Sequence, residues 1–183
     1  LETRAALPGH TAGVLCCAAS STWSIAVTGS ADHSVIVWDL NRCRFVRQLK
    51  EPDQPIQLVA IDDQRGWIAA AAGSEVWVWS INGFLLVHQS TRSATNDPPS
   101  SMTFVARDFH VDKLGVLVTG HRDCIVMWDI VSNHARATPP RWRLEKNTVL
   151  SLRQSSKATC LYMPNTSTLC TGHEDGEVYV WTL

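Results

Sequence analysis

Four tryptophans recur along this chain at similar intervals, and each stands near the end of a short run of β-branched and other apolar residues. The runs are SVIVWDL, EVWVWSI, CIVMWDI and EVYVWTL, and their tryptophans are Trp38, Trp79, Trp128 and Trp181. The spacings are 41, 49 and 53 residues, and an Asp follows the first and the third tryptophan. A period of this length indicates repeated structural units that bury their apolar faces against one another.

The Trp-Asp pair and a period of about 40–45 residues are typical of the blades of a WD40-type β-propeller. A blade is a sheet of four strands, lettered a to d from the central channel outward. We therefore predict an all-β fold with four WD40 blades, at about residues 8–49, 55–89, 101–145 and 157–183. Strand d of the third blade is expected at Arg141–Leu144, and the fourth blade ends with Glu177–Trp181 and lacks strand d.

The two ends of the chain are one strand out of phase, because Glu2–Leu7 stands where strand d of a preceding blade would end. Two interpretations follow. Either four blades close into a ring, with Glu2–Leu7 paired to Glu177–Trp181, or the chain is part of a larger ring, which typically has seven blades. We favour the larger ring because blade twist and tryptophan packing suit it better. An open arc would expose apolar sheet faces and unpaired edges.

Composition agrees with a core built from sheets. Of the 183 residues, 45% are hydrophobic and 18% are charged, which is ample for a sizeable core. Lys and Arg total 16 against 17 Asp and Glu, and this balance argues against broad electrostatic binding to nucleic acid. No apolar run approaches the ~20 residues of a membrane span. The six cysteines form no Cys-x-x-Cys pair, and we expect reduced, structural thiols in a cytosolic protein, with a disulfide or a metal site as the alternative: Cys16, Cys17, Cys43, Cys124, Cys160 and Cys170.

The first unit contains the residues of a WD40 hydrogen-bond network in order. His10 is followed by Thr28 or Ser30, and then by Asp32 and Trp38. In such a network an imidazole joins a carboxylate in the b–c turn to a strand hydroxyl near the indole, which satisfies buried polar groups. A hydrolase triad is the competing interpretation, but the order, the spacing and the tryptophan favour the structural network. We expect partial networks from Thr119, Asp123 and Trp128 in the third blade and from Thr171, Asp175 and Trp181 in the fourth.

The sequence contains no motif that would carry catalysis. It has no Gly-x-Ser-x-Gly, no phosphate-binding glycine loop and no paired-carboxylate motif. His33, His121 and His173 lie in or beside b–c turns, but blade spacing places these turns too far apart for one metal ion. We therefore expect no enzyme activity, no cofactor and no metal.

Two polar segments, Ser90–Ser101 and Val131–Arg141, interrupt the period. They are either mobile surface loops or loops that dock a partner. The segment Arg141–Lys146 that follows the second of them has two interpretations as well. It is an exposed basic and aromatic patch, or it is the outer strand with Trp142 packed inward.

Three stretches resemble the C-terminal WD40 propeller of BEACH-domain proteins, and the closest likeness is to the autophagy-linked branch with FYVE domains. They are VTGSADHSVIVWDLNRCRFVRQL (Val27–Leu49), VWVWSINGFLL (Val76–Leu86) and VTGHRDCIVMWDI (Val118–Ile130). The fourth blade fits only as a generic repeat. The chain departs from the pattern because the second blade lacks the usual His lead-in, and no FYVE zinc finger is present.

The resemblance implies a non-enzymatic scaffold for vesicle traffic or selective autophagy, cytoplasmic or peripheral on endosomal or autophagic membranes. Its partners would be other proteins, with a BEACH domain upstream in the parent chain, and membrane contact would come only through the parent protein or its partners. The competing interpretation is a WD40 subunit of a nuclear or RNA-associated complex. Docking is expected on the top face, which the d–a loops and b–c turns form, through Arg122, Glu174, His33, Glu51, Asp53 and Glu75.

Overall fold

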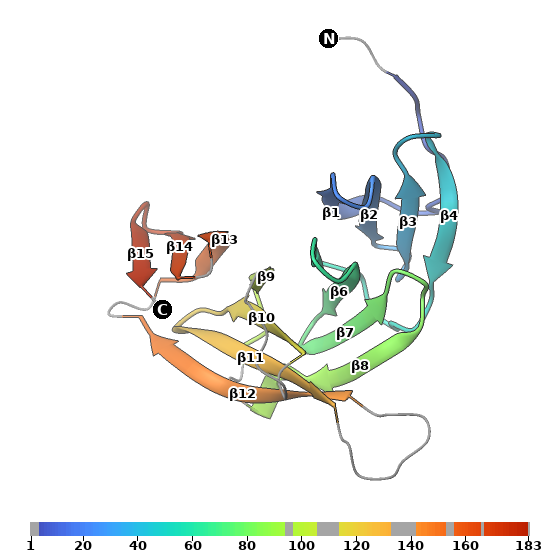
Figure 1. Ribbon diagram of the computed structural model, residues 1–183. Helices are drawn as coiled ribbons and strands as arrows, with labels where there is room; N and C mark the ends of the chain where they lie inside the picture. The colour runs from blue at the N-terminus through green and yellow to red at the C-terminus, as the bar shows by residue number, and fades with distance from the viewer. Residues whose placement is uncertain are drawn as a thin grey trace.

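The computed structural model describes residues 4–93, 97–105, 114–132, 142–152, 156–165 and 167–182, and these form four antiparallel sheets in an open arc (Figure 1). The predicted all-β propeller fold is confirmed. The first sheet contains β1 (Val14–Ser20), β2 (Ile25–Ser30), β3 (Val35–Asp39) and β4 (Arg44–Leu49). The second contains β5 (Leu58–Ile61), β6 (Trp67–Ala72), β7 (Glu75–Ser80) and β8 (Leu85–Ser90), and a 3₁₀ turn, Thr91–Ser93, follows it.

The third sheet contains β9 (Ser101–Val105), β10 (Gly115–Gly120), β11 (Cys124–Ser132) and β12 (Trp142–Ser151). The fourth has three strands, β13 (Ala158–Asn165), β14 (Thr168–His173) and β15 (Val178–Thr182). Each sheet is one blade, and its strands follow one another in sequence order. In the described part of the chain no helix is long and apolar enough to cross a membrane.

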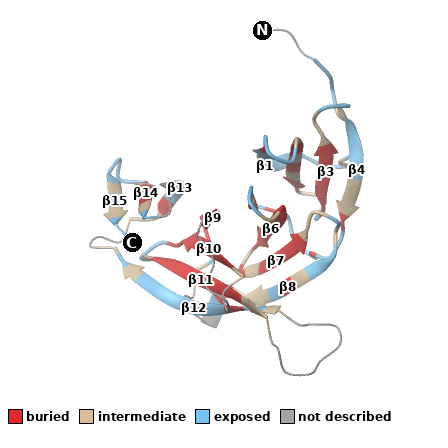
Figure 2. Cartoon of the chain, viewed as in Figure 1, coloured by how far each residue is buried: buried red, intermediate tan, exposed pale blue. Residues whose placement is uncertain are grey.

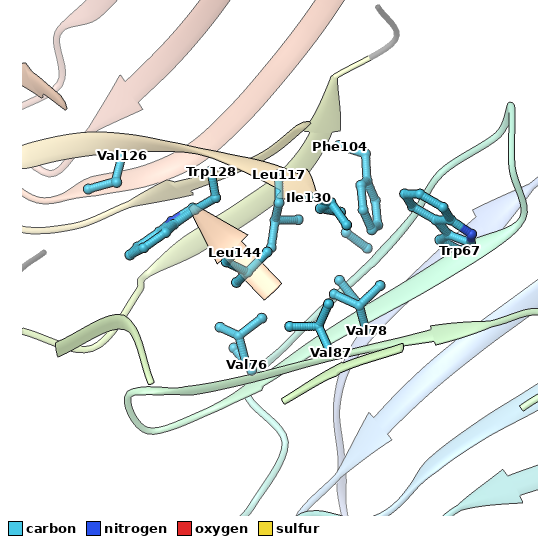
Figure 3. Close-up of a cluster of buried hydrophobic side chains, with 13 residues drawn as sticks. Trp67, Val76, Val78, Val87, Phe104, Leu117, Val126, Trp128, Ile130 and Leu144 are labelled. Carbon is cyan, nitrogen blue, oxygen red and sulfur yellow. The ribbon is translucent and has the colours of Figure 1, made fainter. Parts of the chain in front are cut away.

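The blades stack because the middle strands are apolar on both faces. In β6 all six residues are buried, and their small alanines let the neighbouring sheets approach closely. Figure 2 shows this burial concentrated in the second and third strands of the first three blades. Between blades two and three, Trp67 and Val78 meet Phe104 and Ile130 in the core cluster of Figure 3. Each joint of the arc is therefore a separate apolar core between two sheets.

The outer strand of the third blade is longer than predicted. The sequence indicated Arg141–Leu144, but β12 continues to Ser151 and pairs with β11 along its whole length. The strand continues because strand d of a blade has one side open to water, so charged and polar residues such as Glu145–Asn147 fit in it. Of the two interpretations for Trp142, the structure has the packed strand, with Trp142 edge-on to Trp67 at 5.1 Å between ring centroids.

The arc does not close within the described residues. β15 pairs only with β14, and Arg4–Gly13 contains no strand. In Figure 1 the N-terminal segment extends from the first blade, away from β15. The interpretation as a four-bladed ring closed by pairing of Glu2–Leu7 with Glu177–Trp181 is therefore wrong for residues 4–182. Whether the chain belongs to a seven-bladed ring stays a prediction.

The joint between the first two blades depends on a glycine. A Cβ at Gly29 in β2 would lie 2.4 Å from Ile56 Cγ2 and 2.7 Å from Cys16 Sγ. Ile56 is fixed in the joint, since it is fully buried and its N–H donates to Ser30 O at 3.0 Å, and the half-buried Cys16 contacts it, with Sγ 3.6 Å from Ile56 O. Close packing of this kind leaves no room for a methyl group.

We predict that Gly29→Ala destabilises the protein by about 1–3 kcal/mol, because added volume in a packed joint forces its neighbours apart. Urea unfolding followed by tryptophan fluorescence measures the change. Gly13→Ala is the matched control, because a Cβ at Gly13 meets no atom within 4 Å. Equal midpoints for the two variants would contradict this account of the joint.

Candidate functional site

Four side chains of the first blade form a continuous chain of hydrogen bonds. Trp38 Nε1 donates to Thr28 Oγ1 at 2.8 Å, and this oxygen lies 2.8 Å from His10 Nε2. On the other side of the ring, His10 Nδ1 lies 2.9 Å from Asp32 Oδ2. A carboxylate accepts only, so Nδ1 carries the proton and Nε2 accepts the hydroxyl proton of Thr28. The network therefore connects strand c to the b–c turn through the loop before β1.

The carboxylate of Asp32 accepts hydrogen bonds from its own turn and from the loop before β1. Thr11 N–H donates to Oδ2 at 2.8 Å, and Ser34 donates to Oδ1 both from its backbone at 3.0 Å and from its hydroxyl at 2.6 Å. Burial acts to raise the pKa of Asp32, but the hydrogen bonds from Ser34, Thr11 and His10 outweigh burial and hold the pKa well below its ordinary value. Asp32 is thus ionised and fixes both top-face loops of the first blade.

The structure places Thr28, and not Ser30, in this network. Ser30 Oγ instead donates toward Ala12 O and Gly13 O, at 3.2 and 3.0 Å, and accepts from the N–H of Asp32. The reason is register, because Ala26 pairs with Trp38: Thr28 is the next residue on that face of β2, whereas Ser30 is four residues away, at the end of the strand. Ser30 therefore braces the d–a loop separately.

In the third and fourth blades the histidine of the network stands at the end of strand b, not before strand a as in the first blade. Trp128 Nε1 donates to Thr119 Oγ1 at 2.8 Å, and Thr119 Oγ1 lies 2.9 Å from His121 Nε2. His121 Nδ1 then lies 2.9 Å from the carbonyl of Asp97 in the loop before β9.

The fourth blade repeats this arrangement. Trp181 Nε1 donates to Thr171 Oγ1 at 3.1 Å, and Thr171 Oγ1 lies 2.8 Å from His173 Nε2. His173 Nδ1 lies 3.1 Å from Ser156 O. A backbone carbonyl thus replaces the carboxylate of the first blade.

The sequence suggested that Asp123 and Asp175 accept a hydrogen bond from a histidine as Asp32 does. Neither turn carboxylate has this role. Asp123 is exposed, and Asp175 accepts the N–H of Glu177 at 3.0 Å within its own turn, which holds the pKa of Asp175 below its ordinary value. The histidine two residues after the threonine already reaches the d–a loop, so no carboxylate is needed. The signal was present in the sequence as Thr-Gly-His, which occurs once in each of these two blades.

The second blade has no hydroxyl at the corresponding position. Ala70 stands two residues beyond Ile68, the partner of Trp79 in the β6–β7 ladder. Trp79 is held by packing, with 1% of its surface exposed. The joint with the first blade, rather than a polar network, fixes this blade.

Five of the six predicted docking residues are exposed on the top-face loops, and the sixth, Glu75, is the first residue of β7 and is half-buried. Arg122 Nε lies 3.9 Å from Asp97 Oδ2, and Lys157 Nζ lies 3.7 Å from Glu174 Oε1, so the third and fourth blades each carry one open ion pair there. The other four predicted residues are distributed over the first two blades. His33, Glu51 and Asp53 are exposed, and Glu75 lies 3.3 Å from the ring of His88 on the outer strand.

Asp32→Ala tests the network of the first blade. It leaves His10 Nδ1–H and the turn amides without their acceptor, and loss of such a partner costs about 1–3 kcal/mol. Thermal or urea unfolding measures the change. The control is Asp123→Ala, which removes an exposed carboxylate at the equivalent place in the third blade and is expected to change stability little. A melt of Asp32→Ala equal to that of the wild type would show that the network contributes nothing.

The buried ring of His121 makes stability depend on pH. Burial lowers the pKa of His121 below its ordinary value of 6.5, against the opposing effect of Asp97. The unfolded chain therefore binds more protons, and the stability contributed by neutral His121 is present above about pH 6.5 and is lost as the pH falls toward the lowered pKa. We expect His121→Gln to lose less unfolding free energy than the wild type between about pH 7.5 and about pH 5.5. Identical profiles for the wild type and His121→Gln would contradict the assignment.

Comparison with known proteins supports the assignment of the WD40 repeat and identifies proteins that are similar to this chain. The family model of the "WD domain, G-beta repeat" matches residues 1–39 and 146–182. The BEACH domain-containing protein A2 of Arabidopsis thaliana is 37% identical over 72% of the chain, and the human WD repeat- and FYVE domain-containing protein 4 is 29% identical over the whole chain. The human Lysosomal-trafficking regulator is 33% identical over half of the chain. The chain spans only 3 to 7% of the length of these relatives.

A solved structure shows the same fold. The crystal structure of the computationally designed Ika4 protein superposes with a TM-score of 0.65 at 20% identity, over 97% of this chain and 96% of that one. The repeat model and the sequence relatives agree with the tryptophan period and with the three stretches that match the BEACH pattern. The chain is therefore a WD40-type propeller, and it is similar in sequence to BEACH-domain proteins.

Proposed function

We propose that this propeller is a non-enzymatic docking module, which holds other proteins on its top face as part of a BEACH-type protein in vesicle traffic or selective autophagy. The observation that carries the proposal is that charged side chains stand exposed on loops whose backbones are fixed. Asp32, His121 and His173 each tie a d–a loop to the strands or turn beside it. Loops on a rigid scaffold present recognition groups with little loss of conformational entropy on binding.

Charge on this face favours a partner with basic groups. Among the described residues of the d–a loops and b–c turns, carboxylates outnumber cations, although the whole chain is nearly neutral. Complementary charge gives orientation and speed of association more than raw affinity. The acidic side chains of these loops and turns are Asp32, Glu51, Asp53, Asp97, Asp123, Glu174, Asp175 and Glu177.

The cellular setting is part of the same proposal. The name of the Lysosomal-trafficking regulator connects one relative with traffic to lysosomes. We place this chain in the cytoplasm, peripheral to endosomal or autophagic membranes and attached to them through the rest of its parent protein or through partners. A nuclear or RNA-associated complex is the second candidate, and the net charge of −1 counts against it.

Charge reversal tests the docking face. We expect the double variant Arg122→Glu, Glu174→Lys to lose partners that the wild type captures from a cell extract, measured by quantitative mass spectrometry of the bound proteins. Both residues are exposed, so the variant should fold as the wild type does. The matched control is Lys146→Glu, an exposed reversal on the outer strand β12. Equal capture by the double variant and by the control would contradict the assignment of this face.

A further inference from the structure

The outer wall of the arc carries charge mainly of one sign. The outer strands β4, β8 and β12 lie along the convex side of the arc (Figure 1). Two Arg in β4, and one Arg and one Lys in β12, stand against a single carboxylate, Glu145. The chain as a whole has a net charge of −1, and its top-face loops are acidic. The propeller therefore has an excess of positive charge on its outer wall and of negative charge on its top face.

Apolar side chains stand exposed on this wall between the first two blades. Phe84, directly before β8, is 70% exposed, and Leu85 beside it is 44% exposed. Val46, on the neighbouring outer strand β4, is 42% exposed. Blade two has a described blade on each side, so the exposure of Phe84 does not depend on what lies beyond either end of the chain. Large apolar side chains that gather at the surface mark an interaction site.

The backbone that carries Phe84 is fixed. Ser80 N–H donates to Phe84 O at 2.9 Å, and Phe84 N–H donates to Ser80 Oγ at 3.2 Å. Gly83 N–H donates to Ser80 O at 2.8 Å, and its φ of 82° is one that glycine adopts freely. Arg47 of β4 donates to Asn82 O in the same turn. The turn therefore presents Phe84 to solvent with little loss of backbone entropy on binding.

Besides Arg47, the first blade brings two more arginines to this part of the wall. Arg42 Nη1 and Arg44 Nε lie 3.5 and 3.9 Å from Asp39 Oδ2. Two guanidinium groups against one carboxylate leave an excess of positive charge. We define the rim patch as the exposed or half-exposed residues of this region: Arg44, Val46, Arg47, Phe84 and Leu85.

Arg44 stays accessible even with a further blade in front of the first. It has the position in blade one that Phe84 has in blade two, because the next residue of each pairs with the tryptophan of strand c. Phe84 is 70% exposed although blade one lies beside it. The 63% exposure of the Arg44 side chain is therefore a property of the outer wall and not of the end of the arc.

We propose that the rim patch binds the surface of a lipid bilayer with anionic headgroups. Arg44 and Arg47 contact the headgroup phosphates and carboxylates, and Phe84 enters the boundary between headgroups and acyl chains. A bilayer fits this convex patch better than an acidic protein does, because a fluid apolar layer receives a protruding side chain without a preformed pocket. The contact is separate from attachment through the parent protein or its partners, and it does not depend on docking at the top face.

Vesicle flotation with the full chain tests the rim patch. We expect binding to phosphatidylcholine vesicles that contain phosphatidylserine, little binding to vesicles of phosphatidylcholine alone, and weaker binding as salt rises. Phe84→Ser should weaken binding to the anionic vesicles about tenfold, because the phenyl ring no longer leaves water. Arg44→Glu should weaken it about tenfold or more, whereas Arg44→Lys keeps the positive charge and should bind nearly as the wild type does.

The matched control is Val149→Ser, since Val149 is 42% exposed on β12 and lies outside the rim patch. It should bind vesicles as the wild type does. All three side chains are exposed, so circular dichroism should show an unchanged fold for every variant.

Equal binding to neutral and anionic vesicles would overturn the proposal, and so would wild-type binding by both Phe84→Ser and Arg44→Glu. Absence of vesicle binding would overturn it as well. If the two variants then lost an acidic protein that the wild type captures, the rim patch would be a protein-docking surface instead.

Discussion

Burial of both faces of each sheet is the constraint on which this molecule depends. A single blade is too thin to have an interior, so its core exists only where it meets the next blade. β6 shows the consequence most directly, because all six of its residues are buried and four of them are alanines. Close packing in a joint requires small residues, such as Gly29 against Ile56, and it positions the tryptophan of each strand c. Loops and networks are arranged around joints that apolar packing has already defined.

An indole in the middle of such a stack brings a polar N–H with it, and the blades handle this N–H in different ways. In three of them a threonine accepts the indole proton and passes a hydrogen bond to a histidine. The histidine then donates to the Asp32 carboxylate in the first blade, or to the carbonyls of Asp97 and Ser156 in the other two. Either acceptor satisfies the ring and ties a top-face loop to its blade. The network therefore tolerates loss of the turn carboxylate, provided that the histidine moves to the end of strand b.

The sequence could predict the strands and the tryptophan–threonine contacts, because a period of two within a strand fixes which side chains share a face. The sequence left Thr28 and Ser30 open as the partner of Trp38, and the b–c register of the structure decides for Thr28. The histidines of blades three and four could not be placed in this way, since the expected source was a loop residue before strand a, and the hydrogen bond of His121 to Asp97 O depends on where the loop runs. β12 was underestimated for a related reason. Its exposed side is polar, so no apolar alternation marks how far the strand continues beyond Leu144.

The open ends and the top face are physically coupled. Each d–a loop is held by the blade that follows it and lies beside the b–c turn of the blade before it, as Ile56 and Ser30 show across the first joint. The loop that contains His10 and Thr11 has only the first of these neighbours within the described chain. Its outer side would acquire a second wall only when a blade covers the pocket beside Trp38. A partner that touches this loop and the preceding blade together would therefore bind only after the arc has been completed, whereas the loops of blades two to four are complete in the arc itself. Recognition at the first blade would then report ring closure, while recognition at Arg122, whose b–c turn already lies beside the loop that leads into the fourth blade, would not.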